Sequence, residues 1–361
     1  MRRYAEITGW GKCMPPAVMS NADMASVLDT SDEWIRSRSG ISERRVSHVP
    51  VSDLASVAGH RALAAAGARP EEVDLLIIAT CSPDTVIPST AAHVQRKMGA
   101  MNAAVFDLNA GCSGFIYALN VATAMIRTGS YRKALVVGAE RITWFLNWSL
   151  RDTAVLFGDG AGAVVLEPGE QETGLLACHL GCESDALEAL LVPNFGTAGN
   201  RFVDNYPVFG VRFDGREIFR RAVKGMAEEI HLVMQETGLQ QSEIDLVIPH
   251  QANERIIESL ARHLGVDMSR VVLNINKYGN TSAATIPVAL TEALEQGRIH
   301  SGSMLLLAAF GAGLTRAAGL IRWGERVSPL GQSDAELPPC DLTALEIMRE
   351  AIERTQGAQG Q

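Results

Sequence analysis

The distribution of apolar residues along the chain predicts strands alternating with helices. Residues 73–80 and 105–109 are short apolar runs rich in β-branched residues, as in buried strands, and residues 115–128 are apolar nearly all round, as in a buried helix. Residues 52–67 and 216–237 also have helical patterns, the second of them amphipathic. This alternation indicates an α/β fold, with layers of helices on sheets and ligands bound at strand ends.

The chain contains an internal repeat with a period of about 170 residues. Residues 238–246 repeat the pattern of 67–75, and residues 303–307 repeat that of 133–137. At nearly the same offset, the strand, glycine turn and helix around Cys112 recur around Asn280. We therefore predict two copies of one βα unit, residues 1–170 and 171–325, followed by a linker and a short helix in 326–361.

Local signals predict several element ends. Thr30 and Glu33 have the spacing of a capping box, which predicts a helix that carries Trp34. Asp341 is the expected cap of the terminal helix, which runs to about Glu353 and docks through one apolar face. Residues 183–213 are rich in Gly, Asn and Pro and are expected to form a loop over a site or at a dimer edge. The apolar face of the terminal helix contains Leu342, Leu345, Met348 and Ile352.

Composition excludes several classes of protein. A formal net charge of -9 disfavours nucleic-acid binding, and six cysteines without a framework spacing fit reduced thiols better than disulfides or a zinc site. The start lacks the apolar core of a signal peptide, and no uncharged apolar run is long enough to span a membrane. We expect a cytoplasmic protein. The glycine-rich stretches at 157–162 and 310–313 do not lead into helices as a dinucleotide-binding motif would, so NAD is not expected.

Three residues at strand ends or glycine turns could form one catalytic constellation. Cys112 lies where a strand turns into a helix, and a helix N-terminus favours the reactive thiolate. Asn280 occupies the matching turn of the second repeat, and His250 directly follows an apolar strand. A buried structural cysteine and a semi-buried histidine are the simpler interpretations of these residues taken singly.

A Cys, His and Asn set serves two different chemistries. In a cysteine hydrolase the histidine takes the thiol proton, but the Ala-Gly-Cys-Ser-Gly flanks and the duplicated α/β chain argue against that class. In carbon–carbon bond formation the cysteine accepts an acyl group, and an enolate made from a second thioester attacks it. His250 Nε2–H and the Asn280 amide would then donate to the developing oxyanion.

Five motifs in order carry a family resemblance. They are Thr-Ser-Asp-Glu-Trp-Ile at 30–35, Asn-Ala-Gly-Cys-Ser-Gly at 109–114, Phe-Gly-Asp-Gly-Ala-Gly at 157–162, His-Gln-Ala-Asn at 250–253 and Gly-Asn-Thr-Ser-Ala-Ala at 279–284. Over residues 4–323 the sequence resembles β-ketoacyl-acyl-carrier-protein synthase III. The resemblance implies a thiolase-like fold layered α-β-α-β-α with a pseudo-twofold axis, and the triad Cys112, His250 and Asn280.

The resemblance also implies roles for other residues. Trp34 and Arg38 would flank the adenine of coenzyme A, with Arg151 and Arg255 near its phosphates or the carrier protein. The backbone N–H groups of Cys112 and Ala312 would form an oxyanion hole for acyl transfer. An acidic carrier protein would meet a basic surface of Arg216, Arg220, Lys224, Arg255 and Arg262. The enzymes are homodimers, and the strand at 105–109 is the expected interface.

The expected reaction joins an acyl-CoA primer to malonyl-acyl-carrier protein with loss of CO₂, without a metal or redox cofactor. Ile87 lines the acyl pocket from the neighbouring subunit in the family; acetyl-preferring members can have phenylalanine there, so a primer longer than acetyl is expected. Arg316 replaces a usual tryptophan, and the tail after Trp323 is extra. These departures leave open a condensing enzyme of a specialised pathway. A non-catalytic acyl-binding paralogue is the alternative from another class.

Overall fold

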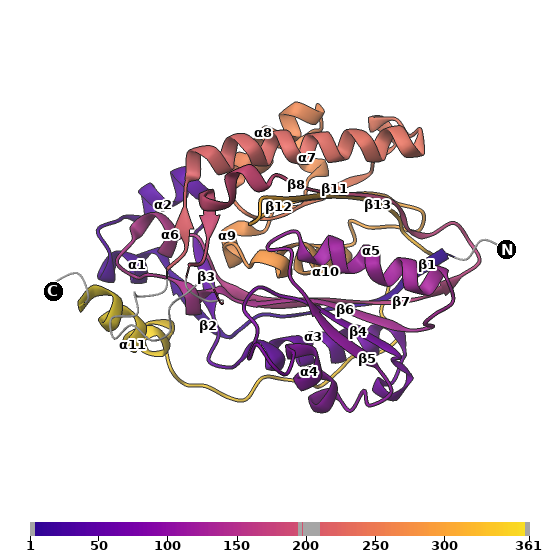
Figure 1. Ribbon diagram of the computed structural model, residues 1–361, viewed down its shortest axis with the longest axis horizontal. Helices are drawn as coiled ribbons and strands as arrows, with labels where there is room; N and C mark the ends of the chain where they lie inside the picture. Colours follow the sequence, from indigo (N-terminus) through magenta and orange to yellow (C-terminus); the bar gives the residue numbers. More distant parts are fainter. Residues whose placement is uncertain (1–3, 194–196, 198–209, 358–361) are drawn as a thin grey trace.

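The protein consists of five layers, in which two sheets separate three layers of helices (Figure 1). The computed structural model describes residues 4–193, 197 and 210–357. Helices α5 (Gly114–Arg127) and α10 (Thr285–Glu295) lie between the sheets. Helices α3 (Val51–Ala66) and α4 (Thr90–Met98) cover one outer face, while α7 (Gly215–Thr237) and α8 (Glu254–Leu264) cover the other. The predicted α-β-α-β-α layering is confirmed.

The order of strands repeats outward from the middle of the structure. From β1 (Tyr4–Cys13) the order is β7 (Asp159–Gly169), β6 (Ala134–Arg141), β4 (Leu75–Ala79) and β5 (Ala104–Leu108). From β8 (Gly174–Cys182) it is β13 (Thr315–Arg322), β12 (Met304–Gly311) and β11 (Leu246–Pro249). In both copies two antiparallel pairings precede a parallel one, and β1 and β8 meet through the single pair Ala5 and Gly174. The repeat detected in the sequence therefore corresponds to a duplicated topology, while the domain boundaries at 170 and 325 stay predictions.

Alternating side chains on each strand fill different layers. On β4, Leu75 and Ile77 join the central core with α5 and α10, whereas Leu76 and Ile78 pack against α3 and α4. Strand β12 divides its side chains in the same way between the centre and the face covered by α7 and α8. Because both faces of each sheet are covered, these strands are apolar throughout rather than alternating.

Smaller elements complete the fold. The strands are β2 (Ala17–Ser20), β3 (Glu43–Val46), β9 (Leu190–Leu191) and β10 (Arg212–Phe213). The helices are α1 (Asn21–Val27), α2 (Asp32–Ser39), α6 (Arg151–Ala154) and α9 (Ile275–Tyr278). Short 3₁₀ segments are Pro70–Glu72, Ile142–Phe145, Ser184–Ala189, Gln241–Glu243, Met268–Arg270 and Ser282–Ala284. No helix in the described ranges is long and apolar enough to cross a membrane.

Three local predictions differ from the structure. The cap of α2 is Ser31, whose hydroxyl accepts the N–H of Trp34, rather than Thr30. The strand expected before Asn280 is reduced to one parallel bridge between Val247 and Val271, because the chain turns into α9. Within the loop expected at 183–213 the structure has a 3₁₀ turn and the pair β9–β10; residues 194–196 and 198–209 lie outside the described residues.

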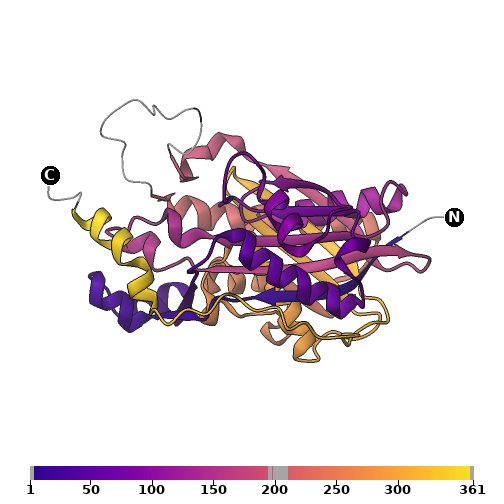
Figure 2. The same ribbon diagram turned by 90° about the horizontal axis from the view of Figure 1, so that it is seen from below.

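The tail runs across the outer face of α3 and ends in α11 (Ala344–Gly357), at the end of the molecule that carries α1 and β2 (Figure 2). Arg61 pairs with Glu336, and the amide of Leu330 donates to the Ala65 carbonyl. Thr343, rather than Asp341, forms the capping box of α11 with Glu346. Docking through one face is confirmed: Ala344, Met348 and Ile352 join the buried cluster of Met19 and Met24, whereas Leu342 stays 53% exposed.

Candidate active site

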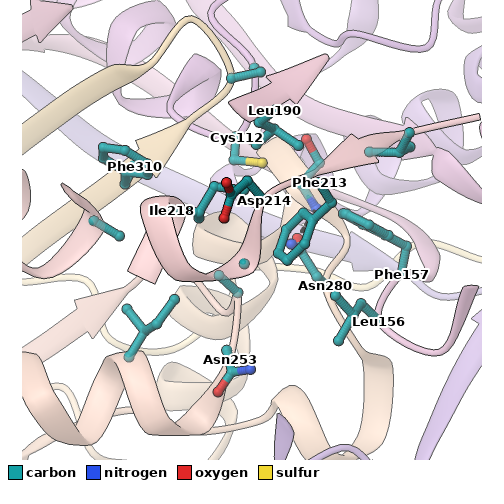
Figure 3. Close-up of a pocket in the computed structure, with 18 of the residues that line it drawn as sticks. Cys112, Leu156, Phe157, Leu190, Phe213, Asp214, Ile218, Asn253, Asn280 and Phe310 are labelled. Carbon is teal, nitrogen blue, oxygen red and sulfur yellow. Dashed lines mark hydrogen bonds between the residues drawn. The ribbon is translucent and has the colours of Figure 1, made fainter. Parts of the chain in front are cut away.

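A cavity of about 1520 Å³ brings together the three residues of the expected triad. Cys112, His250 and Asn280 all line it, and each of the three is at least 92% buried. Figure 3 shows Cys112 and Asn280 in this cavity with the apolar side chains Ile218, Phe213 and Phe310. Apolar side chains therefore surround the three residues, which is the usual character of a small-molecule site.

Cys112 lies in the turn between β5 and α5, packed against the glycine-rich turn after β12. A Cβ on Gly111, which has φ +54°, would lie 2.9 Å from the backbone nitrogen of Ala312. A Cβ on Gly311 would lie 2.6 Å from the backbone nitrogen of Cys112. Both glycines are needed because the two turns touch, and this contact puts Ala312 beside the nucleophile turn as the family resemblance implied.

The expectation that Cys112 rests as a thiolate disagrees with its surroundings. Burial raises the pKa of this thiol to about 12, although a hydrogen bond with Ser282 opposes the shift. The loss of hydration therefore favours the thiol over the thiolate at Cys112. Chemistry at this sulfur needs a group that takes the proton as the bond forms.

Asn280 is fixed at both its backbone and its side chain. Its N–H donates to the Leu156 carbonyl at 2.9 Å, and its carbonyl accepts from Gly158 at 3.1 Å. The side-chain Oδ1 accepts the N–H of Ser282 at 2.8 Å. Because Oδ1 is occupied, the amide NH₂ remains as the donor available to a ligand.

His250 is held at the end of β11 with one ring nitrogen bonded to a neighbouring helix. Its backbone N–H donates to the Ala308 carbonyl at 2.8 Å, and Nδ1 lies 2.7 Å from Thr285 Oγ1. Burial lowers the pKa of the imidazole to about 3. The ring is therefore neutral and could take a proton or donate one, according to its tautomer.

Sequence reasoning missed the buried residues behind this triad. Ser282 is the only non-glycine residue with positive φ (+51°) in the described part of the chain. Its N–H donates to Asn280 Oδ1 and its hydroxyl donates to Glu140 at 3.0 Å, so it links Asn280 to a buried carboxylate. Only its place in the Gly-Asn-Thr-Ser-Ala-Ala motif hinted at such a role.

Glu140 is a fully buried carboxylate that anchors the chain around the nucleophile. It accepts hydrogen bonds from Ser282, from the backbone N–H groups of Cys81 and Ser82, and from their side chains, with Thr80 as a further donor. Burial raises its pKa, and the hydrogen bonds from Ser82, Cys81 and Ser282 oppose the shift. No sequence signal marked it, since one acidic residue at a strand end is common.

The His-Gln-Ala-Asn motif has a structural explanation. Gln251 donates to the carbonyls of Pro249 and Val272 and accepts the N–H of Asn274, which joins β11 to the segment before α9. Asn253 caps α8 through the N–H of Arg255 and donates to the Arg38 carbonyl. The motif therefore orients His250 and connects α8 to α2.

The mouth of the cavity carries the aromatic and basic residues expected to meet coenzyme A. The guanidinium groups of Arg38 and Arg151 lie 4.7 and 4.5 Å from the Trp34 ring centroid. Trp34, Arg38 and Arg255 line the cavity, whereas Arg151 is beside Trp34 and donates to the Asp29 carbonyl.

The five basic residues expected to bind a carrier protein differ in whether they already form ion pairs with acidic side chains. Arg220, Lys224 and Arg262 form ion pairs with Glu217, Glu228 and Glu258 on their own helices. Within the described ranges Arg216 and Arg255 have no ion-pair partner, and both line the cavity. The positive charge of the entrance is therefore concentrated at these two residues and Arg38.

Ile87 and Arg316, the two residues that differ from the family pattern, lie away from the three residues of the expected triad. Ile87 is 87% exposed and does not line the cavity of its own chain. Arg316 forms ion pairs with Glu183, Glu228 and Glu229, which connect β13 to α7. In this chain the arginine therefore ties α7, one wall of the cavity, to the sheet.

Comparisons with known proteins agree with the fold. Residues 106–184 and 234–323 match the models for 3-oxoacyl-[acyl-carrier-protein (ACP)] synthase III and for its C-terminal region. The chain is 57% identical to β-ketoacyl-[acyl-carrier-protein] synthase III 2 of Vibrio cholerae over 97% of both chains.

Two solved structures are also similar. The 3-oxoacyl-[acyl-carrier-protein] synthase III of Aquifex aeolicus is 42% identical, with a TM-score of 0.83, and covers 88% of this chain and 100% of its own. The priming β-ketosynthase of the R1128 polyketide pathway is 31% identical, with a TM-score of 0.85, over 90% of this chain and 98% of its own.

Five layers, a duplicated topology and a cysteine in the central cavity define the class: a condensing acyltransferase of the thiolase fold. Within that class, the chain belongs to the β-ketoacyl-acyl-carrier-protein synthase III family.

Proposed function

We propose that this enzyme condenses an acyl-CoA primer with malonyl-acyl-carrier protein to give 3-oxoacyl-acyl-carrier protein, CO₂ and free CoA. The observation that carries the proposal is the convergence of Cys112, His250 and Asn280 on one cavity. The three residues come from both copies of the repeat, and together they supply a nucleophile, a proton acceptor and an amide donor.

In the first half-reaction Cys112 attacks the primer thioester. Because the thiol is protonated, its proton passes to His250 Nε2 as the carbon–sulfur bond forms, and the same proton then goes to the leaving CoA sulfur. The N–H groups of Cys112 and Ala312 stabilise the tetrahedral oxyanion, which their adjoining turns favour.

In the second half-reaction the malonyl thioester loses CO₂ and becomes an enolate. Its oxygen receives hydrogen bonds from the Asn280 amide and from His250 Nε2–H, and its carbon attacks acyl-Cys112. Expulsion of the cysteine sulfur as a thiolate gives the 3-oxoacyl product, and a proton from water restores the thiol. The hydrogen bond from Ser282 to Asn280 supports this role, since it turns the NH₂ group toward the ligand.

The residues at the entrance support binding of coenzyme A and of an acidic carrier. Trp34 offers an aromatic face that Arg38 and Arg151 already cover, so an adenine ring could replace one guanidinium in the stack. Arg255 and Arg216 are available for phosphate or for carboxylates of the carrier protein.

We also propose a homodimer that pairs through β5. This strand lies at the edge of its sheet with partly exposed residues, and Val86, Ile87 and Met101 are exposed apolar side chains in neighbouring segments. In such a dimer Ile87 would project into the partner's cavity, where a side chain smaller than phenylalanine leaves room for a primer longer than acetyl.

Mass spectrometry of the protein after incubation with acyl-CoAs of graded length tests this function. Acyl adducts are expected on Cys112, largest for medium or branched chains, and malonyl-acyl-carrier protein should release them as 3-oxoacyl product. The alternative, a condensing enzyme of a specialised pathway, is favoured by the structural likeness to a polyketide priming synthase. Adducts that transfer only to an acceptor other than malonyl-acyl-carrier protein would support that alternative.

A further inference from the structure

In the proposed reaction His250 Nε2 is a proton acceptor in one half-reaction and a hydrogen-bond donor in the other. The following inference rests on that proposal. In acyl transfer Nε2 must be free to accept the thiol proton, so the ring's own proton has to be on Nδ1. In condensation Nε2 must donate to the enolate oxygen, so the proton has to be on Nε2 and Nδ1 becomes an acceptor. A carboxylate beside Nδ1 would favour only the first arrangement.

The partner of Nδ1 is a hydroxyl group, which can accept or donate. Thr285 Oγ1 lies 2.7 Å from His250 Nδ1 and 3.0 Å from the carbonyl oxygen of Ser282. When the hydroxyl proton points to Ser282, Thr285 accepts from Nδ1–H. When it points to the imidazole, Thr285 donates to the bare Nδ1.

When the Thr285 hydroxyl rotates between these two orientations, the Ser282 carbonyl keeps a hydrogen-bond donor. Ser282 O also receives the backbone N–H of Thr285, so it stays hydrogen-bonded when the hydroxyl turns away. Thr285, Ser282 and His250 are all at least 97% buried, so Nδ1 depends on Thr285 for its hydrogen bond. Within the described part of the chain Thr285 is the only hydrogen-bond partner of the imidazole ring.

The titratable groups around this network do not force either tautomer by a direct contact. Cys81 after β4 and Glu140 on β6 contact the hydroxyl of Ser282, and Cys112 on the α5 turn lines the same cavity as His250. Of the other charged residues that line the cavity, Arg38 and Arg255 are on α2 and α8, Asp152 on α6, Glu188 on the 3₁₀ turn before β9, and Asp214 and Arg216 at the start of α7.

We propose that Thr285 is a two-way hydrogen-bonding partner that keeps both neutral tautomers of His250 accessible, one for each half-reaction. The change between them leaves the ring's proton count unaltered: Nε2 gains one proton and Nδ1 loses one, exchanged with water that enters the cavity when CoA leaves. Thr285 touches no substrate and is a positioning residue.

The test compares Thr285→Val, which keeps the shape and removes the hydroxyl, with Thr285→Ser, which keeps the hydroxyl. In Thr285→Val a buried Nδ1–H would have no acceptor, and orphaned N–H groups are rarer in proteins than orphaned acceptors. The Nε2–H tautomer should therefore dominate. Acyl transfer to Cys112 should fall roughly 10²-fold, the range of a lost proton transfer. Decarboxylation of malonyl thioester, measured in the Cys112→Ala background, should change by less than about threefold, and Thr285→Ser should restore acyl transfer.

Nitrogen NMR of protein labelled at histidine reads the tautomer directly, with His250→Asn to assign the signals. Averaged shifts of two tautomers are expected in the unchanged protein and in Thr285→Ser, and a single Nε2–H form in Thr285→Val. The same tautomer in all three proteins overturns the inference, as does an equal loss of both half-reactions in Thr285→Val. The NMR result stands even if the enzyme uses other substrates, so the two proposals fail separately.

Discussion

The side-chain oxygen of Asn280 accepts the backbone N–H of Ser282 at 2.8 Å, and this bond sets which end of the amide faces the cavity. Asn280→Asp tests the consequence, because the same bond would hold the carboxylate in place while the donor is lost. We expect malonyl decarboxylation to fall roughly 10²–10³-fold, with acyl transfer to Cys112 much less affected. Release of labelled CO₂ and adduct formation measure the two steps. Asn102→Asp, at an exposed site, is the control, and unchanged decarboxylation in Asn280→Asp would contradict the donor role.

Cys112→Ala should abolish the acyl adduct and retain some decarboxylation of malonyl thioester, because the enolate donors do not depend on the sulfur. Adduct mass spectrometry and CO₂ release distinguish the two activities. Cys340→Ala, in the tail, should leave both unchanged. Condensation at the unchanged rate in Cys112→Ala would mean that the nucleophile is wrongly assigned.

The alkylation rate of Cys112 should increase with pH. Since burial raises the pKa of this thiol to about 12, the thiolate fraction grows about tenfold per pH unit between roughly pH 7 and 9. At pH 8 its reaction with iodoacetamide should be on the order of 10³-fold slower than that of a cysteine with an ordinary pKa. Free N-acetylcysteine, measured alongside, provides the reference. A plateau below pH 8 would show a depressed pKa instead.

Glu140→Gln should destabilise the protein by about 1–3 kcal/mol, because the new NH₂ group would face N–H and O–H donors that now find an acceptor. Urea denaturation measures the change in the free energy of unfolding. Glu350→Gln, which removes an exposed ion pair with Arg354, should change it by less than about 0.5 kcal/mol. Equal changes in the free energy of unfolding for the two substitutions would show that the hydrogen bonds of Glu140 do not stabilise the fold.

Ile352→Ala should weaken the docking of α11 by about 2 kcal/mol, since the side chain is 7% exposed within the cluster around Met19 and Met24. Thermal melting of the full chain measures this loss. Leu342→Ala, at a residue 53% exposed just before the helix, should have almost no effect. If both variants melt like the unchanged protein, the tail does not contribute to stability.

The sequence predicted those parts of the fold and site that depend on local pattern. The turns at Cys112 and Asn280 and the strand end at His250 are visible because apolar runs and glycines mark them, and the repeat relates two of them. Ser282, Thr285 and Glu140 gave no comparable signal, since their roles arise only when β4, β6 and α10 meet. A helix end can be read from a sequence, whereas the burial that raises the pKa of the Cys112 thiol cannot.

Neither repeat could work by itself. Cys112 precedes one central helix, α5, and Asn280 precedes the other, α10, so a single copy would hold only part of the proposed reaction centre. Each central helix also packs against strands of the opposite copy, α5 against β8 and β13 and α10 against β1 and β7. Substitutions in one repeat are therefore constrained by the contacts it makes with the other. If the gene is split between β7 and β8, the two fragments should be active only when they reassociate.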